Sequence, residues 1–407
     1  MSTAKERLVV VGASLAGLRA IEAARTEGYR GEITLIGEEI HAPYDRPPLS
    51  KAYLEGATHD TTFRELLTLT DELGTTLRLG ETATGLDVAQ KEVHTDRGSV
   101  PYTDVIIATG SSPRRMPGAE SLAGVYVLRT IDDAMALRRE VRPGTRVVVI
   151  GAGFIGSEVA SSCKKIGAEV TIVEAAPVPL ARAVGAMGST LTSLHSSHGV
   201  QVRIGVAVQE LLGTDRIAGV RLADGTVLEA DVLVVGIGSS PATSWLHDSG
   251  LELHALDKGI VCDATLAASA PGVWAAGDVA HWYNGAFKSE MRLENWTNAA
   301  QQGAHAARNV ALGTREAYAT VPYYWSDWYE HRIQFVGIPT ADEVHIASGS
   351  IDEGRLIALY RKEDRIVGAL TVRQPRQIMK LRALIEQRAS WDQALELAAH
   401  AQPVTTR

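Results

Sequence analysis

The sequence is poor in cysteine. Its 407 residues include only Cys163 and Cys262, which stand 99 positions apart and form no C-x-x-C pair. Neither a disulfide framework nor a metal cluster is therefore indicated, and no metal ligand is predicted. A chain with so few thiols is expected in a reducing cytoplasm.

The chain also lacks an excess of positive charge and any long hydrophobic run. Its net charge of −8 argues against general nucleic-acid binding. Apolar runs such as 232–235 have the length of a strand and are too short to span a bilayer. A strand that begins near Arg7 leaves no room for a signal peptide. We expect no nucleic-acid partner and no membrane segment.

Length and composition indicate an ordinary globular protein of several domains. At 407 residues the chain exceeds the size of a single hydrophobic core, so two or three domains are expected. Hydrophobic residues make up 45% and charged residues 22% of the sequence, which is typical of folded globular domains.

Two stretches share one pattern, in which a buried strand runs into a glycine-rich turn and then a helix. Glycines at such a turn let backbone amides approach a pyrophosphate, whose charge the helix N-terminus stabilises. The first turn has a serine where the middle glycine is expected; a serine fits if the turn is slightly opened, and its hydroxyl can bond phosphate. The turn residues are Gly12, Ser14, Ala16 and Gly17 in the first copy and Gly151, Gly153, Ile155 and Gly156 in the second.

Each turn is followed by a second strand that ends in a carboxylate. Glu38 lies 21 residues beyond Gly17, and Glu174 lies 18 residues beyond Gly156. A carboxylate at this place accepts hydrogen bonds from a ribose diol and repels a 2′-phosphate, so Glu174 favours NADH over NADPH. An exposed acid at a strand end is the alternative. Two such sites predict a protein that moves electrons between two dinucleotides.

Segments 104–113 and 231–241 are near copies, and each closes a stretch that one glycine-rich turn opens. This repetition predicts an internal duplication in which the second dinucleotide domain is inserted in the first. A shift in composition near residue 321 marks a third region. Strands over 355–360 and 365–372 and a helix over about 376–388 are expected there.

Several motifs together resemble the FAD-dependent, NADH-using ferredoxin reductases that serve bacterial oxygenases and cytochromes P450. The resemblance covers nearly the whole chain. It implies an α/β fold with two Rossmann-like domains of the glutathione-reductase type, one inserted in the other, and an α+β C-terminal domain. The implied domains are FAD-binding (1–110 and 240–320), NADH-binding (111–239) and a C-terminal interface (321–407). The motifs lie at 12–17, 44–51, 128–134, 151–158, 274–278, 294–299 and 325–327.

The resemblance assigns residues to FAD and to the co-substrate NADH. In the FAD set, Glu38 bonds the adenosine ribose, and Asp278 bonds the ribityl chain unless it is a simple helix cap. Trp325 joins Trp296 beside the flavin unless both are core residues. The FAD set is Gly12, Ser14, Ala16, Gly17, Glu38, Arg46, Lys51, Ala83, Arg129, Asp278 and Trp296. The NADH set is Gly151, Gly153, Ile155, Gly156, Glu158, Glu174 and Gly238.

The catalytic pair that the resemblance implies is Lys51 and Glu158. A buried ammonium near flavin N5 stabilises electron density that arrives on the ring, and a carboxylate partner keeps that charge from standing alone. A surface lysine and a glutamate on a helix face are the alternative, because the two residues are far apart in sequence.

The expected electron acceptor is a 2Fe–2S ferredoxin. Disulfide reductases of this fold use redox thiols beside the flavin, whereas both cysteines here fall where core packing is expected. On the predicted C-terminal helix, Arg376 and Lys380 lie opposite the apolar face, so an acidic ferredoxin could dock there; a solvated basic face explains them equally well. Two other functions stay open, an NADH oxidase or monodehydroascorbate-type reductase and a redox-sensing interaction protein like apoptosis-inducing factor.

Overall fold

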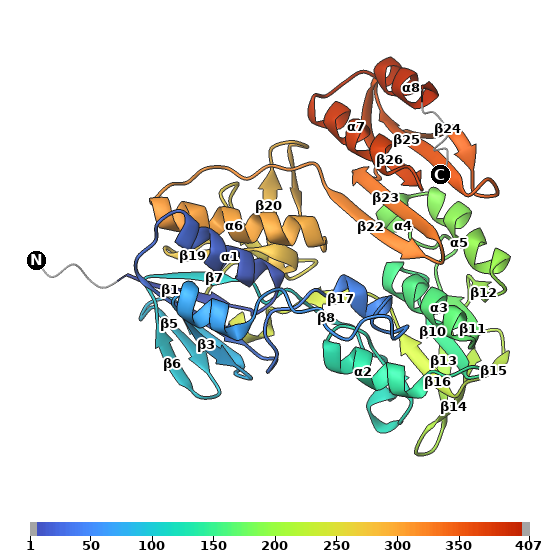
Figure 1. Cartoon of the computed structure of the whole chain (residues 1–407), viewed down its shortest axis with the longest axis horizontal. Coiled ribbons are helices and arrows are strands. Elements are labelled where there is room, and N and C mark those ends of the chain that lie inside the picture. The colour runs from blue at the N-terminus through green and yellow to red at the C-terminus, as the bar shows by residue number, and fades with distance from the viewer. Residues whose placement is uncertain (1–5, 401–407) are drawn as a thin grey trace, which may run out of the picture. The chain divides into compact units, whose positions relative to one another are not determined.

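Two parallel sheets are built from the strands around the glycine-rich turns. The computed structural model describes residues 6–400, so the outermost residues of the predicted segments 1–110 and 321–407 lie outside the described part. The chain divides into two compact units (Figure 1). The first comprises Met1–Asp45, Thr61–Ser112 and Ser239–Thr320, and the second Arg46–Asp60, Pro113–Gly238 and Val321–Arg407.

The first unit contains a five-stranded parallel sheet whose strand order is β19-β7-β1-β2-β3. Apart from the edge strand β3, which is more polar and partly exposed, its strands are short apolar runs with little exposed surface, as expected for a parallel sheet. The strands are β1 (Arg7–Val11), β2 (Glu32–Gly37), β3 (Thr75–Leu79), β7 (Asp104–Ile107) and β19 (Val273–Ala275).

Helix α1 (Leu15–Thr26) packs closely against α6 (Trp296–Leu312) in this unit (Figure 1). A Cβ at Gly303 would lie 2.1 Å from the carbonyl oxygen of Ala16, so the two helices meet where α6 has no side chain. Two smaller sheets complete the unit. They are the antiparallel β4 (Ala83–Asp87), β5 (Glu92–Thr95) and β6 (Gly98–Pro101), and the mixed β18 (Ile260–Cys262), β20 (Ala280–Asn284) and β21 (Ser289–Met291).

The second unit repeats the plan of the first. Its parallel sheet has the order β12-β11-β10-β16-β9. In chain order, a three-stranded antiparallel sheet follows β12 and precedes β16, just as β4–β6 follow β3 and precede β7 in the first unit. The parallel strands are β9 (Val125–Tyr126), β10 (Arg146–Ile150), β11 (Glu169–Glu174), β12 (Gln201–Ile204) and β16 (Val232–Val235). The antiparallel strands are β13 (Val208–Gly213), β14 (Ile217–Leu222) and β15 (Val227–Glu229). The helices are α2 (Ile131–Glu140), α3 (Phe154–Ile166), α4 (Ala181–Val184) and α5 (Met187–Ser197).

The C-terminal part of the second unit is an antiparallel sheet with two helices. The strand order is β22-β23-β26-β25-β24, and the apolar residues Ile378, Leu381 and Ile385 of α7 are buried. The predicted strands and helix of this region are confirmed within two residues. The elements are β22 (Tyr323–Trp328), β23 (His331–Gly337), β24 (Glu343–Ser350), β25 (Arg355–Lys362), β26 (Arg365–Val372), α7 (Pro375–Glu386) and α8 (Trp391–Ala399).

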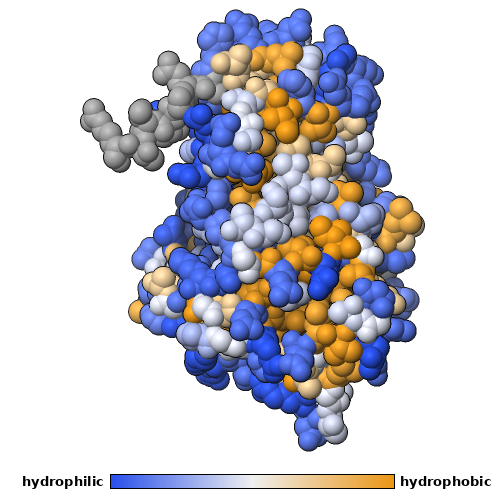
Figure 2. Space-filling model, turned by 90° about the vertical axis from the view of Figure 1, so that its right-hand side faces the viewer, coloured by the Kyte–Doolittle hydropathy of each residue, from blue (hydrophilic) through white to orange (hydrophobic). Residues whose placement is uncertain are grey.

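These elements confirm the predicted fold class, which is two Rossmann-type parallel sheets with an α+β C-terminal region. Within residues 6–400, no helix combines the length and the apolar character needed to cross a membrane. Figure 2 shows apolar patches that are interrupted by hydrophilic residues.

Candidate dinucleotide sites and a buried lysine–glutamate pair

The first glycine-rich turn joins β1 to α1 and has no space for side chains at two positions. Gly12 has φ +121°, and a Cβ there would lie 2.2 Å from the carbonyl oxygen of Ala108. A Cβ at Gly17 would lie 2.0 Å from the carbonyl oxygen of Gly12. Both positions therefore require glycine, because a methyl group would force the backbone apart.

Ser14 departs from the glycine pattern without strain. It is the N-cap residue of α1, with φ −124° and ψ −161°, an extended conformation that any residue adopts. In the second turn, Gly153 precedes α3 with φ −73° and ψ 178°, and a Cβ there would meet only an oxygen 4.0 Å away. The backbone of this fold thus accepts a side chain at the middle position.

The second turn joins β10 to α3 with the same backbone plan. Gly151 has φ +98°, and a Cβ there would lie 2.3 Å from the carbonyl oxygen of Gly236. A Cβ at Gly156 would lie 2.1 Å from the carbonyl oxygen of Gly151. Ile155, in the first turn of α3, is 48% exposed, and Gly238 has φ +95° with open space around a Cβ.

The N-termini of α1 and α3 are left open by their own side chains. Neither helix has a side-chain cap or an acidic residue in its first turn. By contrast, α2 is capped by Thr130, and Asp132 and Asp133 occupy its first turn. The first amides of α1 and α3 therefore meet the requirement for binding an anionic phosphate.

The two predicted ribose carboxylates differ in their surroundings. Glu174, at the end of β11, accepts hydrogen bonds from the backbone N–H of Ala152 at 2.8 Å and of Ala176 at 2.7 Å. Glu38 follows β2 and is exposed. The second turn is thus tied to its carboxylate through Ala152.

Lys51, which is partly buried, and Glu158, which is buried, form an ion pair within the second unit. Lys51 Nζ lies 2.7 Å from Glu158 Oε2 and donates to the carbonyl oxygen of Pro47 at 3.1 Å. Glu158 is 3% exposed and accepts hydrogen bonds from the hydroxyls of Ser50 and Ser326, each at 2.5 Å. Besides the contact with each other, three further groups satisfy the two charges, as a buried pair requires.

Ser50 and Ser326 were missed at the sequence level. Ser50 lies in the motif 44–51, next to Lys51, and Ser326 lies in the motif 325–327, between Trp325 and Asp327. The signal was present, but only the folded structure shows that loop 46–60 and strand β22 bring polar groups to the Glu158 carboxylate of helix α3.

Arg46 and Arg129 also lie together in the second unit. Arg46 Nη1 donates to the carbonyl oxygen of Arg129 at 2.7 Å, and the N–H of Arg129 donates to Asp133 Oδ2 at 2.9 Å. Loop 46–60 is thereby attached to the start of α2. The flavin or phosphate contact predicted for these arginines stays a prediction.

Asp278 and Trp296 lie in the first unit. Asp278 Oδ2 accepts a hydrogen bond from Ser111 Oγ at 2.9 Å, and Trp296 Nε1 donates to Asp45 Oδ1 at 2.7 Å. Ala83 is half-buried at the start of β4. Ser111 and Asp45, which contact these predicted residues, lie within segments 104–113 and 44–51 but were not themselves predicted as site residues.

Both cysteines are buried and unpaired, one in each unit. Burial raises the pKa of Cys163 to about 12 and also raises the pKa of Cys262. Since the thiolate is the reactive form, these thiols are poorly suited to redox chemistry. The prediction that both pack in the hydrophobic core is confirmed.

Fold and site together define a class of protein that has two dinucleotide-binding domains and an antiparallel C-terminal domain. A family model for pyridine nucleotide-disulphide oxidoreductases matches residues 6–303, and one for the reductase C-terminal domain matches residues 323–405. The chain belongs to the pyridine nucleotide-disulphide oxidoreductase family and is an oxidoreductase, as the resemblance predicted.

Relatives match over almost the whole chain. The rhodocoxin reductase of Rhodococcus erythropolis is 36% identical over 96% of this chain and 94% of that protein. The benzene 1,2-dioxygenase system ferredoxin–NAD(+) reductase subunit of Pseudomonas putida is 34% identical over 93% and 92%. The crystal structure of the covalent putidaredoxin reductase–putidaredoxin complex is similar with a TM-score of 0.91, at 29% identity, over 98% of this chain and 99% of that one.

Family membership implies FAD and NAD(P)H, and both glycine-rich turns fit such ligands. Gly12 and Gly151 have positive φ and no room for a Cβ, while the helices that follow are uncapped. These are the features that a pyrophosphate requires of a protein backbone.

Proposed function

We propose that the protein is a ferredoxin reductase, which takes electrons from NADH through FAD and delivers them to a 2Fe–2S ferredoxin. That ferredoxin would serve a cytochrome P450 or a ring-hydroxylating oxygenase. The observation that carries the proposal is the repeated site, in which two like sheets each present an open glycine-rich turn and a carboxylate. The names of the relatives support the choice of acceptor.

FAD, when bound, accepts a hydride from NADH and releases electrons one at a time. In this proposal Gly12, Ser14, Ala16 and Gly17 receive its pyrophosphate. The further FAD residues are Glu38, Arg46, Ala83, Arg129, Asp278 and Trp296.

We assign Lys51 the role of stabilising negative charge on the reduced flavin. Glu158 keeps the ammonium oriented, since its carboxylate lies 2.7 Å from Nζ. Ser50 and Ser326 hold that carboxylate in place. Such preorganised charge lowers the free energy of a reduced group without moving a proton.

NADH is assigned to the second turn, with Glu174 on the adenosine ribose. The hydrogen bonds that Glu174 accepts from the backbone N–H groups of Ala152 and Ala176 hold its carboxylate in place before any ligand binds. A 2′-phosphate would meet this negative charge, so NADH is favoured over NADPH. Gly151, Gly153, Ile155, Gly156 and Gly238 complete the proposed site.

We propose that the ferredoxin docks near Arg376 and Lys380, which are exposed on α7. Positive side chains attract an acidic partner and raise the rate of encounter at low salt.

The free, buried cysteines suit a reducing cytoplasm.

Stopped-flow spectroscopy of the purified flavin-loaded protein tests the function. NADH is expected to bleach the flavin band rapidly and NADPH slowly, and cytochrome c is expected to be reduced only when a 2Fe–2S ferredoxin is added. Reduction of oxygen or of monodehydroascorbate without ferredoxin would replace the proposal with a small-molecule reductase. Slow bleaching with NADH-induced dimerisation would replace it with a redox-sensing interaction protein.

The double variant Arg376→Glu/Lys380→Glu tests the docking surface. The rate of ferredoxin reduction should fall about tenfold at low salt and approach the wild-type rate at high salt, because screening removes steering. Ferricyanide reduction should not change. Lys362→Glu/Arg365→Glu, which reverses two exposed basic residues elsewhere in the same sheet domain, is the matched control. Equal loss in both double variants would contradict the assignment.

A further inference from the structure

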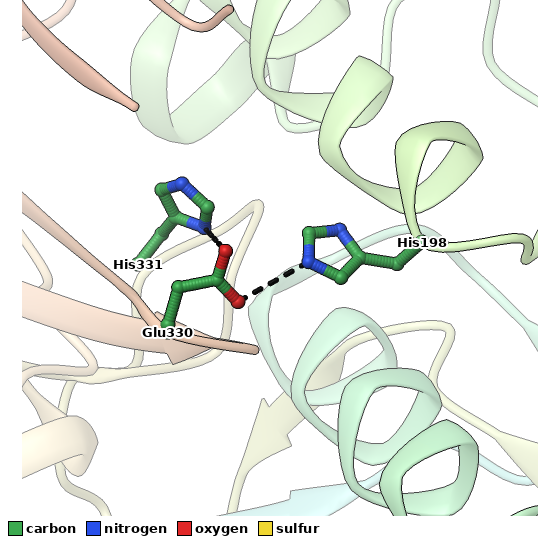
Figure 3. Close-up of side chains that lie close together, drawn as sticks. All are labelled: His198, Glu330 and His331. Carbon is green, nitrogen blue, oxygen red and sulfur yellow. Dashed lines mark hydrogen bonds and ion pairs between the residues drawn. The ribbon is translucent and has the colours of Figure 1, made fainter. Parts of the chain in front are cut away.

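A cluster of two histidines and a glutamate lies outside every site described above. His198 follows α5, while Glu330 and His331 stand at the turn from β22 to β23. Figure 3 shows the two imidazole rings directed at the Glu330 carboxylate from opposite sides. Nε2 of His198 lies 3.2 Å from Oε2 of Glu330, and Nδ1 of His331 lies 3.5 Å from Oε1. All three donor atoms lie within 4.8 Å of one another.

The hydrogen bonds of His198 fix which ring nitrogen is available. Its Nδ1 lies 2.7 Å from the carbonyl oxygen of Leu194. A carbonyl only accepts, so Nδ1 carries the proton and Nε2 is left to face the Glu330 carboxylate. Histidines that bind metals commonly donate their other N–H to a backbone carbonyl in this manner.

His331 contributes the second candidate ligand atom, its Nδ1. The residue is 6% exposed, and its Nδ1 is buried with no hydrogen-bond partner. An unsatisfied buried polar atom is costly, and its presence needs a reason. One divalent cation placed among them would satisfy both rings and the carboxylate together.

We propose that His198, Glu330 and His331 bind Zn²⁺, with water at the fourth position. Two imidazole nitrogens and one carboxylate oxygen are a donor set that zinc accepts. Zinc held tetrahedrally by bonds of ~2.0–2.1 Å places neighbouring donors about 3.3 Å apart. The distance from His198 Nε2 to Glu330 Oε2 is 3.2 Å and that from His331 Nδ1 to Glu330 Oε1 is 3.5 Å, both close to this value. The two distances involve different carboxylate oxygens, and the donor atoms all lie within 4.8 Å of one another, so zinc would draw the three side chains closer together. Glu330 has a 60% exposed side chain, which leaves an entry path from solvent.

The site would link two parts of the second unit. The β22–β23 turn already contacts α3, because the N–H of Tyr329 donates to Ser161 Oγ. It also contacts α5, since the Tyr329 ring stacks on His198 with centroids 3.8 Å apart. Strand β22 carries Ser326, which bonds Glu158. Bound zinc would hold this hairpin against α5 and thereby stabilise the folded protein.

A second cluster, His254, Asp257 and His281, has similar spacing but different electrostatics. Arg292 Nε lies 3.3 Å from Asp257 Oδ2, and the N–H of Gly259 donates to Asp257 Oδ1 at 2.9 Å. The arginine already supplies the positive charge that a metal would bring. This cluster therefore serves as an internal control.

Calorimetric titration of chelator-treated, flavin-loaded protein with zinc chloride tests the proposal. The wild type should bind one Zn²⁺, and at a hundredfold excess of zinc over Kd the Tm should rise by about 3 °C. Magnesium chloride should have no such effect, because Mg²⁺ prefers oxygen ligands.

Variants His198→Gln and Glu330→Gln should weaken zinc binding at least tenfold and abolish the zinc-dependent rise in Tm. The readout is the difference in Tm with and without zinc, so loss of the Tyr329 stacking does not obscure it. His254→Gln is the matched control and should behave as the wild type. Absence of saturable binding, unchanged affinity in the first two variants, or loss of binding in His254→Gln would overturn the proposal. Flavin reduction by NADH plays no part in the test.

Discussion

The first and second glycine-rich turns share a backbone and differ in the side chains around it. Gly12 and Gly151 have positive φ, and Gly17 and Gly156 each sit against the carbonyl of the turn's first glycine. Around this common frame, Ser14 replaces a glycine. The shared backbone is what a pyrophosphate needs. In the proposed function, the differing side chains adapt the first turn to FAD and the second to NADH.

The helices that follow the turns differ in charge at one matching position. Two residues beyond the last glycine, α1 has Arg19 and α3 has Glu158. The Arg19 side chain is 33% exposed and pairs with Glu22 one turn along the helix. Glu158 is buried with Lys51. The same place in the fold therefore holds a partly exposed ion pair in one copy and a largely buried ion pair in the other.

The largest expected effect comes from this position. Glu158→Ala leaves the Lys51 ammonium and two serine hydroxyls without their partner, and it should lower the free energy of unfolding by about 3–5 kcal/mol. Arg19→Ala, the matched change in the first copy, should cost less than about 1 kcal/mol. Urea unfolding followed by circular dichroism measures both. Similar losses would show that the two positions are equivalent.

Alanine in place of the first glycine of each turn should weaken the binding of one dinucleotide and leave the other bound. Gly12→Ala and Gly151→Ala both place a methyl group at positive φ against a carbonyl oxygen, at a cost of about 2 kcal/mol or more. Gly12→Ala should yield protein with little flavin, and Gly151→Ala should keep the flavin but lose affinity for NADH. The ratio of flavin to protein absorbance and an NADH titration check this. Flavin loss from Gly151→Ala alone would reverse the assignment.

Reversing the charge of the second carboxylate should change nucleotide preference. Glu174→Arg removes the repulsion of a 2′-phosphate and the acceptor for Ala152 and Ala176. We expect kcat/KM to fall about 10–100-fold for NADH and to rise for NADPH. Glu38→Arg is the control and should leave the ratio of the two substrates unchanged. An unchanged ratio in Glu174→Arg would reject the ribose assignment.

The smallest effect is expected at the middle position of the turns. Ser14 has extended dihedral angles, so Ser14→Gly relieves no strain and should change the free energy of unfolding by less than about 1 kcal/mol. Gly153→Ser should also fold normally, since space exists for its Cβ, while affinity for NADH falls. Thermal unfolding and NADH titration measure the two effects. Marked destabilisation by Gly153→Ser would contradict the backbone comparison.

Local patterns predicted much of this fold. The strands that precede and follow each turn and the apolar face of α7 follow from short-range patterns of apolar residues. The carboxylates Glu38 and Glu174 stand directly after β2 and at the end of β11. Helix α7 begins at Pro375 and was predicted from about residue 376. Strand β22 was not predicted, and only the shift in composition near residue 321 marked its position, because its aromatic residues suit strands and cores alike.

Contacts between distant segments could not be predicted in this way. The grouping of Arg46–Asp60 with the second unit depends on Ser50, Lys51 and Arg46 reaching residues far along the chain. The cluster of His198, Glu330 and His331 joins residues more than 130 positions apart. No spacing rule covers such a distance.

The sequence by itself determined the two dinucleotide-binding turns, because close backbone approach and positive φ demand glycine at fixed local intervals. It also determined the family, through motifs spread along the chain. Only the tertiary structure decided that Glu158 is buried against Lys51 and Ser326, that the middle turn residue is free to vary, and that two histidines meet one glutamate. These depend on how helices and strands pack, and packing brings together side chains whose separation in sequence carries no information about their distance in space.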